Sequence, residues 1–316
     1  MLLRFLLIIN AVVTLNGCIN EPPPLLRIGT NIWPGYEPFY VARENGWFDE
    51  QQIRLVEFGS AVDVMDALRQ QRIEGGGLTL DEALMLASEG IDLTVVMICD
   101  QSEGADVLMV TPAIQQLAEM RGKRIAVETS AVGALMLEAS LQAADLSRQD
   151  IEVISLEPRE QKHAWEQGTI DAAVTFEPYK SHLQRSGARV LFSSKDIPGQ
   201  ILDVLVIRSH VLDQHKHSLR KLISAFFRAR QQLVQQDRTT LEQINRRLQL
   251  TPDELREAFA GLRLPSVSDN HEWLDNGRQL NQLANSLADL MYRQGLSASQ
   301  HAAIRSSAEL LPEQTP

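Results

Sequence analysis

The residues best suited to contact a small molecule lie in a turn that follows the first apolar run of the chain. The stretch Asn31-Ile-Trp-Pro-Gly-Tyr36 places Trp33 and Tyr36 around a Pro-Gly corner, although aromatic residues make up only 5% of the sequence. These two rings offer flat apolar contact with a polar tip, and Gly35 allows close approach of the backbone. The stretch predicts the lip of a binding site, with a corner packed against its own domain as the alternative.

Other hydrogen-bonding side chains stand in similar turns after apolar runs. Together with the first turn they give the candidate ligand-binding set Asn31, Trp33, Tyr36, Ser60, Thr79, Asp81, Thr129, Ser130, Thr175 and Glu177. Ser60 and Thr79 each precede an acid by three residues, which is the spacing of a helix capping box. Capping alone explains both of them, and they can also contact a ligand.

These turns carry acids and almost no bases. The acids are Glu37, Asp81, Asp100, Glu103, Asp106, Glu128 and Glu177. A sulfonate or nitrate in a dry cleft is expected to attract an Arg or Lys, so the acids favour an amine-bearing or neutral heterocyclic ligand. Acids are also favoured at helix N-termini whatever the ligand is. The ligand class therefore stays open among amine, pyrimidine, sulfonate and oxyanion.

Other reactive residue types form no catalytic or metal-binding pattern. The two histidines of Asp213-Gln-His-Lys-His217 are two residues apart, and on a helix this spacing points them to different faces. We therefore predict no metal site, and a solvated helix start at these residues. No nucleophile and base stand at a readable spacing, so we predict no catalytic residue, no cofactor and no enzyme. Cys99 is expected to be a small buried hydrophobe, with a reactive thiol as the alternative.

The elements that must position these turns alternate along most of the chain. Short β-type runs and helical patterns follow one another between residues 26 and 208, which predicts an α/β fold with largely parallel sheets. Residues 212 to 310 read as helices alone, so the C-terminal third is expected to be helical. A length of 316 residues favours two lobes over a single core.

The N-terminus has the pattern of a secretory signal. Arg4 precedes an apolar stretch, Phe5 to Leu15, that is too short to span a bilayer. Leu15-Asn-Gly-Cys18 resembles a bacterial lipobox, which implies lipidation of Cys18; a signal peptide cut elsewhere, or an uncleaved anchor, is the alternative. Without residues 1–17 the chain has 29 Lys+Arg against 41 Asp+Glu, a net charge of −12, which argues against nucleic acid as a partner.

Several blocks of the chain resemble one protein family. They are the stretch from Arg27 to Phe48, which holds the Trp33 turn, then Ala67–Leu78, Leu117–Val127, Gly168–Tyr179 and Ser268–Leu274. In order and spacing they resemble the periplasmic substrate-binding proteins of the nitrate, sulfonate and taurine class, to which pyrimidine-precursor binders are also similar.

The resemblance implies a two-lobed periplasmic binding protein fold of type II, with mixed, mostly parallel sheets, flanking helices and the ligand between the lobes. The crossing strands would fall near Asp106–Val110 and Asp203–Arg208. We expect a signal peptide at 1–17, a lipid-anchored tether at 18–24, lobe one at 25–107 and 205–300, lobe two at 108–204, and a C-terminal extension at 301–316.

The implied function is that of a solute-binding lipoprotein of an ABC importer. Such a protein is held in the periplasm by its lipid, on either the inner or the outer membrane. It captures a small polar molecule by hinge closure and delivers it to permease subunits. We expect a monomer. One alternative is a ligand-binding accessory of a membrane signalling receptor, and a second is an enzyme on the same fold, similar to pyrimidine-precursor synthases.

Overall fold

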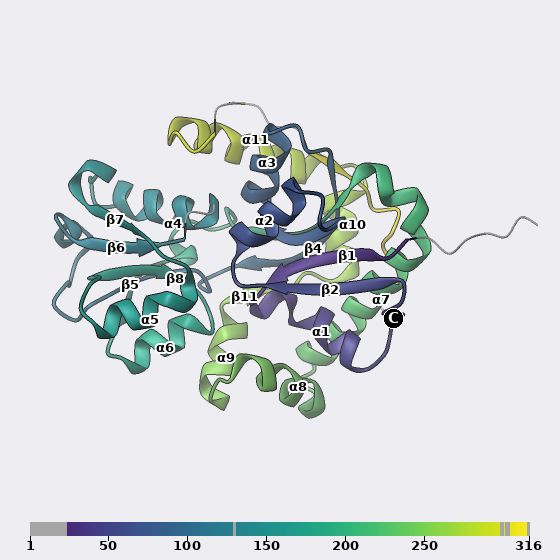
Figure 1. Ribbon diagram of the computed structural model, residues 1–316, viewed down its shortest axis with the longest axis horizontal. Coiled ribbons are helices and arrows are strands. Elements are labelled where there is room, and N and C mark those ends of the chain that lie inside the picture. The colour runs from purple at the N-terminus through teal and green to yellow at the C-terminus, as the bar shows by residue number, and fades with distance from the viewer. Residues whose placement is uncertain (1–23, 129–130, 298–299, 301–303, 315–316) are drawn as a thin grey trace, which may run out of the picture.

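Two β-sheets, each flanked by helices, lie side by side along the long axis of the molecule (Figure 1). The computed structural model describes residues 24–128, 131–297, 300 and 304–314. Cys18, Thr129 and Ser130, all named as candidate functional residues, lie outside the described residues.

The larger sheet, whose elements we call the large lobe, contains both ends of the described chain. Its strands, in spatial order, are β11 (Leu262–Arg263), β4 (Leu93–Ser102), β10 (Leu202–Arg208), β3 (Gly75–Thr79), β1 (Leu26–Asn31) and β2 (Ile53–Phe58), and β12 (Arg305–Ser306) also pairs with β4. Strands β3 and β10 in the middle of this sheet are buried along their whole length, as expected for a sheet covered on both faces.

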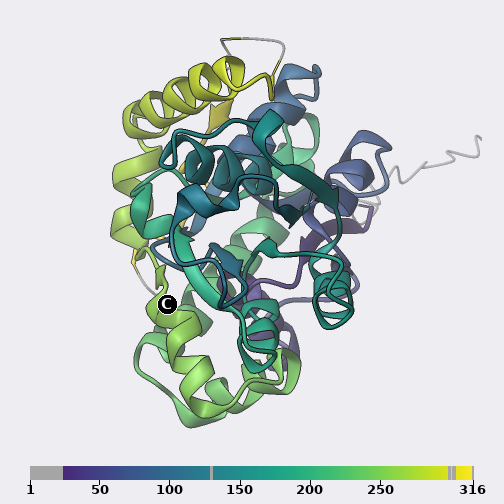
Figure 2. The same ribbon diagram turned by 90° about the vertical axis from the view of Figure 1, so that its left-hand side faces the viewer.

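The smaller sheet, whose elements we call the small lobe, is built from the middle of the chain. Its strands, in spatial order, are β7 (Glu152–Ser155), β6 (Arg124–Val127), β8 (Ala172–Thr175), β5 (Val107–Val110) and β9 (Arg189–Ser193). Figure 2 views the molecule from this end, with the C-terminal helices running down one side.

Helices cover both sheets and make up most of the C-terminal third. They are α1 (Glu37–Glu44), α2 (Ala61–Arg69), α3 (Leu80–Ser88), α4 (Ala131–Gln142), α5 (Pro158–Glu166), α6 (Tyr179–Arg185), α7 (Leu212–Val234), α8 (Arg238–Leu248), α9 (Pro252–Ala260), α10 (Val267–Leu274) and α11 (Arg278–Arg293). Along the described ranges, no helix is both long enough and apolar enough to cross a membrane.

The α/β class with mixed sheets and flanking helices is confirmed, but parallel pairs do not predominate. Among the described strands, five pairings are parallel and five are antiparallel. The reason is that β5 and β10, the strands at which the chain changes sheet, each run antiparallel to both neighbours in their sheet's spatial order.

Two other details differ from the sequence-based expectation. Arg305–Ser306 form strand β12 beside β4 where a helix was expected, so the segment after residue 300 contributes to the large sheet. His215 lies buried in α7, whereas a solvated helix start was expected.

Two short links carry the chain between the sheets. Residues 103–106 join β4 to β5, and residues 194–201 join β9 to β10, so each predicted crossing strand is the strand just after its link. The links are bonded to each other, because the Ser194 hydroxyl lies 2.8 Å from Ser102 Oγ and accepts the Gly104 N–H at 2.6 Å. Two adjacent links between two lobes can act together as a hinge.

Candidate ligand-binding cleft

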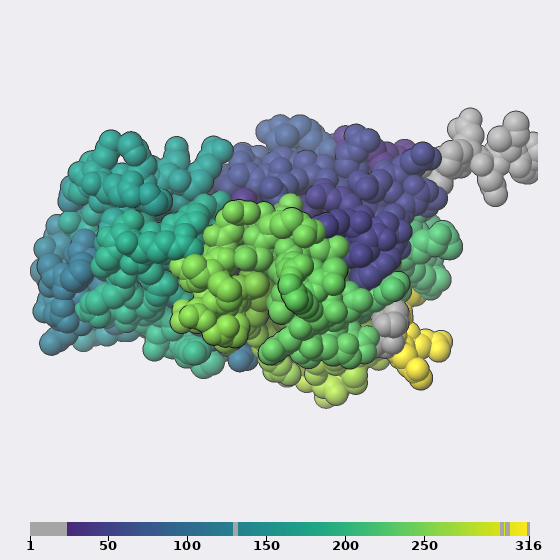
Figure 3. Space-filling view, turned by 90° about the horizontal axis from the view of Figure 1, so that it is seen from below, coloured from purple at the N-terminus to yellow at the C-terminus, as the bar shows by residue number. Residues whose placement is uncertain are grey.

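A small cavity of about 20 Å³ lies where the two lobes meet. Its walls come from both lobes: Asn31, Trp33, Tyr36, Ala61, Thr79, Glu82, Asp106, Glu128, Val132, Phe176 and Asp203. This volume is about that of one water molecule, so the lobes lie close together here and a larger solute enters only if they separate. Figure 3 shows the lobes in contact on the face that carries α8 and α9.

The turn after β1 forms one wall of this cavity. A short 3₁₀ turn, Pro34–Tyr36, follows Trp33 and leads directly into α1. The indole N–H of Trp33 donates to Asp100 Oδ2 at 3.1 Å. Its ring meets the ring of Phe176, from the small lobe, edge to face at 5.5 Å and 77°. Trp33 is only 4% exposed, so it is both a buried packing residue and a contact between the lobes.

The rest of this turn is fitted to its neighbours at atomic contact. A Cβ added at Gly35 would lie 1.7 Å from Asp100 Oδ2, so only glycine leaves room for that carboxyl. The hydroxyl of Tyr36 donates to Asp203 Oδ1. The Tyr36 ring lies over Gly77 of β3, where an added Cβ would come within 2.9 Å of it. The Pro-Gly corner thus fixes both rings at the cavity.

Two acidic side chains that line the cavity lie at helix N-termini. Glu82 Oε2 accepts the backbone N–H of Thr79 at 3.1 Å at the start of α3. Glu128, which follows β6 in the small lobe, accepts the backbone N–H of Val62 at 3.1 Å at the start of α2 in the large lobe. The positive end of each helix stabilises the carboxylate beside it. Glu128 therefore also joins the two lobes.

Two further acids come from the chain segments that connect the lobes. Asp106 ends the first link, and its backbone N–H donates to Ser102 Oγ at 3.2 Å. Asp203 lies on β10 in register with Asp100 of β4, and burial together with the Asp100 carboxyl raises the pKa of Asp203. Two carboxyls this close repel each other when both are ionised, so the pair favours keeping a proton.

Burial raises the pKa of five acids at the cavity or beside it: Glu82, Asp100, Asp106, Glu128 and Asp203. It brings the pKa of Asp106 to about 7, that of Asp100 to about 8 and that of Glu128 to about 7. The pKa values of Glu82 and Asp203 are raised well above the usual range, by burial first and by neighbouring carboxyls second. Near neutral pH, Asp100, Asp106 and Glu128 are therefore poised between the charged and neutral forms.

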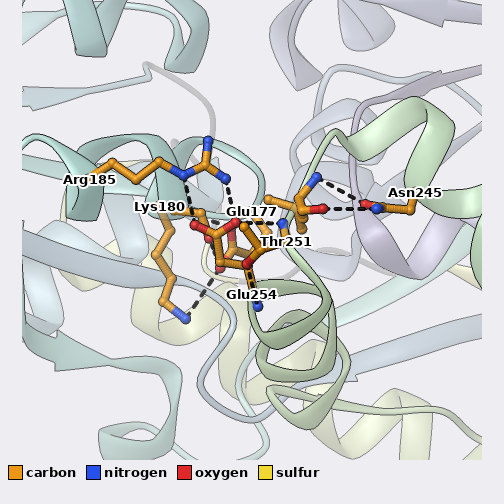
Figure 4. A network of polar contacts seen from close by, with 8 residues as sticks. Glu177, Lys180, Arg185, Asn245, Thr251 and Glu254 are labelled. Carbon is orange, nitrogen blue, oxygen red and sulfur yellow. Dashed lines mark hydrogen bonds and ion pairs between the residues drawn. The ribbon is translucent and has the colours of Figure 1, made fainter.

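A second set of contacts closes the lobes outside the cavity (Figure 4). Arg185 of α6 forms a two-pronged ion pair with Glu254 of α9, with Nε donating to Oε1 at 2.8 Å. Glu254 also accepts the Thr251 N–H at 2.7 Å in the capping box of α9, and the hydrogen bond from Arg185 is the main reason that its pKa falls to about 2. This contact links the small lobe to the C-terminal helices.

The structure brings four of the predicted contacts to the cavity: Asn31, Trp33, Tyr36 and Thr79. Ser60 instead caps α2, since its Oγ accepts the Asp63 N–H at 3.1 Å. Asp81, Thr175 and Glu177 are buried but do not line the cavity.

The carboxylate of Glu177 is held by the Ser181 hydroxyl at 3.0 Å and by Lys180 at 3.4 Å. Glu37, beside the first turn, is paired with Arg247 at 2.8 Å, and burial raises its pKa to about 7. Cys99 is fully buried within the core.

Seven lining residues were absent from the predicted set: Ala61, Glu82, Asp106, Glu128, Val132, Phe176 and Asp203. Some signal for them was present, because Asp106 and Glu128 belong to the acid-rich turns and Asp203 begins a predicted crossing strand. Phe176 stands next to Thr175 and Glu177, so the prediction identifies the turn that reaches the cavity but not the side chain that lines it.

Comparison with known proteins gives consistent matches. The sequence profile of the NMT1-like family matches residues 20–246. A putative aliphatic sulfonates-binding protein of Bacillus subtilis is 24% identical over 68% of this chain and 67% of its own length. The taurine-binding periplasmic protein of Escherichia coli is 25% identical over 63% of each chain.

Solved structures show the same fold. The alkanesulfonate-binding protein SsuA of Xanthomonas axonopodis pv. citri superposes with a TM-score of 0.74 at 20% identity, over 91% of this chain and 100% of that one. The periplasmic nitrate-binding protein NrtA of Synechocystis gives a TM-score of 0.67 at 11% identity, over 88% and 84%. The two sheets joined by two links are thus the periplasmic binding protein fold.

Proposed function

Because this chain belongs to the NMT1-like family, we propose that it is the solute-binding component of an ABC importer rather than an enzyme. It captures a small polar molecule between its lobes and delivers it to permease subunits. The sulfonate- and taurine-binding relatives support this function, since they are binding proteins by name.

The single observation that carries the proposal is a cavity walled by residues of both lobes beside a paired hinge. Trp33 meets Phe176 across the lobes, and Glu128 of the small lobe accepts the Val62 N–H of the large lobe. A ligand in this cavity touches both lobes at once, so it gains contacts in the closed form that it lacks in an open one. Such differential contact is what drives ligand-induced closure.

Closure of the lobes can be tested by X-ray scattering, and capture of a solute by mass spectrometry. Small-angle X-ray scattering on protein stripped of ligand by unfolding and refolding should show a larger radius of gyration than protein with ligand restored. Native mass spectrometry should show one bound molecule per chain and no turnover of it. Identical scattering in both states, or chemical conversion of the bound molecule, would contradict the proposal.

We further propose that Cys18 carries the lipid anchor and that the protein works in the periplasm. The sequence Leu15-Asn-Gly-Cys18 supports this. Expression of the full chain in bacteria should place it in the membrane fraction and label it with a radioactive fatty acid. Cys18→Ala should lose the label, and a labelled Cys18→Ala variant would refute the assignment. Cys99→Ala is the matched control, because that cysteine is buried in the core.

A further inference from the structure

The cleft holds acids that helix capping does not explain. Glu82 and Glu128 sit at helix N-termini, where the helix itself favours a carboxylate. Asp106 and Asp203 do not: one ends the first link and the other lies within a strand. Burying a carboxyl is costly unless something pairs with it, so these two positions call for another partner.

Three of these carboxyls have an oxygen that no described residue satisfies. Asp106 is 5% exposed, Asp203 is 3% exposed and Glu82 is 1% exposed, and all three line the cavity. Within the described residues, Asp106 Oδ2, Asp203 Oδ2 and Glu82 Oε1 have no hydrogen-bond partner. A buried acceptor of this kind is a strong indication that a donor from outside the chain belongs there.

The nearby bases do not neutralise these acids. None of the described residues that line the cavity is basic. Three cations of the two lobes are already paired with acids: Lys180 with Glu177, Arg247 with Glu37 and Arg159 with Glu157. An anion entering this cavity would face four carboxyls without a positive partner, whereas a cation would be paired on several sides.

The remaining lining is aromatic. Trp33, Tyr36 and Phe176 give flat faces beside the carboxyls. Rings and carboxyls together are the usual surroundings of a protonated amine on an organic body, since the ring faces attract the cation and pack against its carbon atoms.

We propose that this cavity takes a small organic cation, a protonated amine whose N–H groups reach the carboxyls of Glu82 and Asp106. This inference rests on the proposed function of solute capture and adds the charge of the solute. It sets this chain apart from relatives whose names specify aliphatic sulfonates.

The test compares three probes that share one ring and differ in charge. Benzylamine, benzyl alcohol and phenylmethanesulfonate are titrated into ligand-stripped protein by calorimetry at neutral pH and low salt. We expect one-to-one binding of the amine, binding of the alcohol at least about tenfold weaker, and the weakest binding for the sulfonate. Tighter binding of the sulfonate or the alcohol than of the amine would overturn the inference and leave solute capture standing.

Identification of the natural solute provides a second, independent arm. Protein purified from its native cells is unfolded in acid, and the released small molecule is identified by mass spectrometry. A released amine supports the inference, and a released anion or neutral molecule overturns it alone. If no molecule is released and none of the three probes binds, the proposed solute capture fails together with the inference.

Variants then locate the contact. Asp106→Asn keeps the shape of the side chain and removes its charge, and should weaken amine binding at least about tenfold. Asp171→Asn is the matched control, because Asp171 is an acid of the small lobe that is paired with Arg124 outside the cavity. If Asp106→Asn and the parent protein bind the amine equally tightly, Asp106 does not contact the amine.

Discussion

Replacement of Asp106 by asparagine should make the ligand-free protein more stable at alkaline pH and leave it unchanged at acid pH. Burial raises the pKa of this carboxyl from 3.8 to about 7, because Asp106 is 5% exposed and Asp81 adds repulsion. A folded-state pKa above the unfolded value means that stability is fully present below the unfolded pKa and is lost as the pH rises through the folded pKa. The loss for Asp106 therefore falls between about pH 4 and pH 8.

The size of the effect follows from the shift. A difference of about three pKa units corresponds to about 4 kcal/mol, at about 1.4 kcal/mol per unit. Asp81, Asp100 and Asp203 all face the same region and interact electrostatically with Asp106. Removing one charge also relieves its repulsion on these neighbours, so the gain in unfolding free energy at pH 8 should reach several kcal/mol.

The assay is urea unfolding of ligand-stripped protein at pH 4.5 and at pH 8, for the parent and for Asp106→Asn. Asp171→Asn again serves as the control and should show the opposite sign. The hydrogen bond from Arg124 lowers the pKa of Asp171, so its contribution is present at neutral pH and is lost as the pH falls. A gain for Asp106→Asn of the same size at both pH values would refute the reasoning, because it would not come from titration.

Three further substitutions test the cleft and its closure. Trp33→Ala should weaken ligand binding by about 2 kcal/mol or more by calorimetry, and an unchanged affinity with a lowered melting temperature would leave it only a packing role. Gly35→Ala should lower the urea unfolding free energy by about 1–3 kcal/mol, because its Cβ would lie 1.7 Å from Asp100 Oδ2; unchanged stability would contradict that contact. Arg185→Ala should weaken ligand binding by up to about 1 kcal/mol, since its exposed ion pair with Glu254 forms between the lobes, and the exchange Arg185→Glu with Glu254→Arg should restore it. Failure of the exchange to restore binding would show that the pair does not act through charge.

The parts of the site that could be predicted from the sequence are those set by neighbours along the chain. The capping residue Ser60, the acid of the capping box at Glu82 and the Trp33 turn all depend on spacings of a few residues. The same local rules gave the α/β alternation. They also placed four of the predicted side chains at the cavity.

The remainder depends on which strands become neighbours. Asp203 meets Asp100 only because β10 pairs with β4, and Phe176 meets Trp33 only because the two lobes close on each other. A hydrophobic run likewise carries no information on strand direction. The sequence therefore does not predict that β5 and β10 run antiparallel to their neighbours. Strand β12, at Arg305–Ser306, is too short to show the alternation of apolar and polar residues that marks a strand.

The direction of β1 determines how the molecule can be held. This strand runs from Leu26 at the outer end of the large lobe to Asn31 at the cavity, a span of six residues or about 20 Å (Figure 1). With the lipid anchor proposed at Cys18, the point of attachment would lie at the end of the large lobe that is far from the cavity. The small lobe would then be the unattached lobe. Its rotation about the links at Ser102 and Ser194 would leave the point of attachment in place. Membrane attachment and closure of the lobes would thus be mechanically independent.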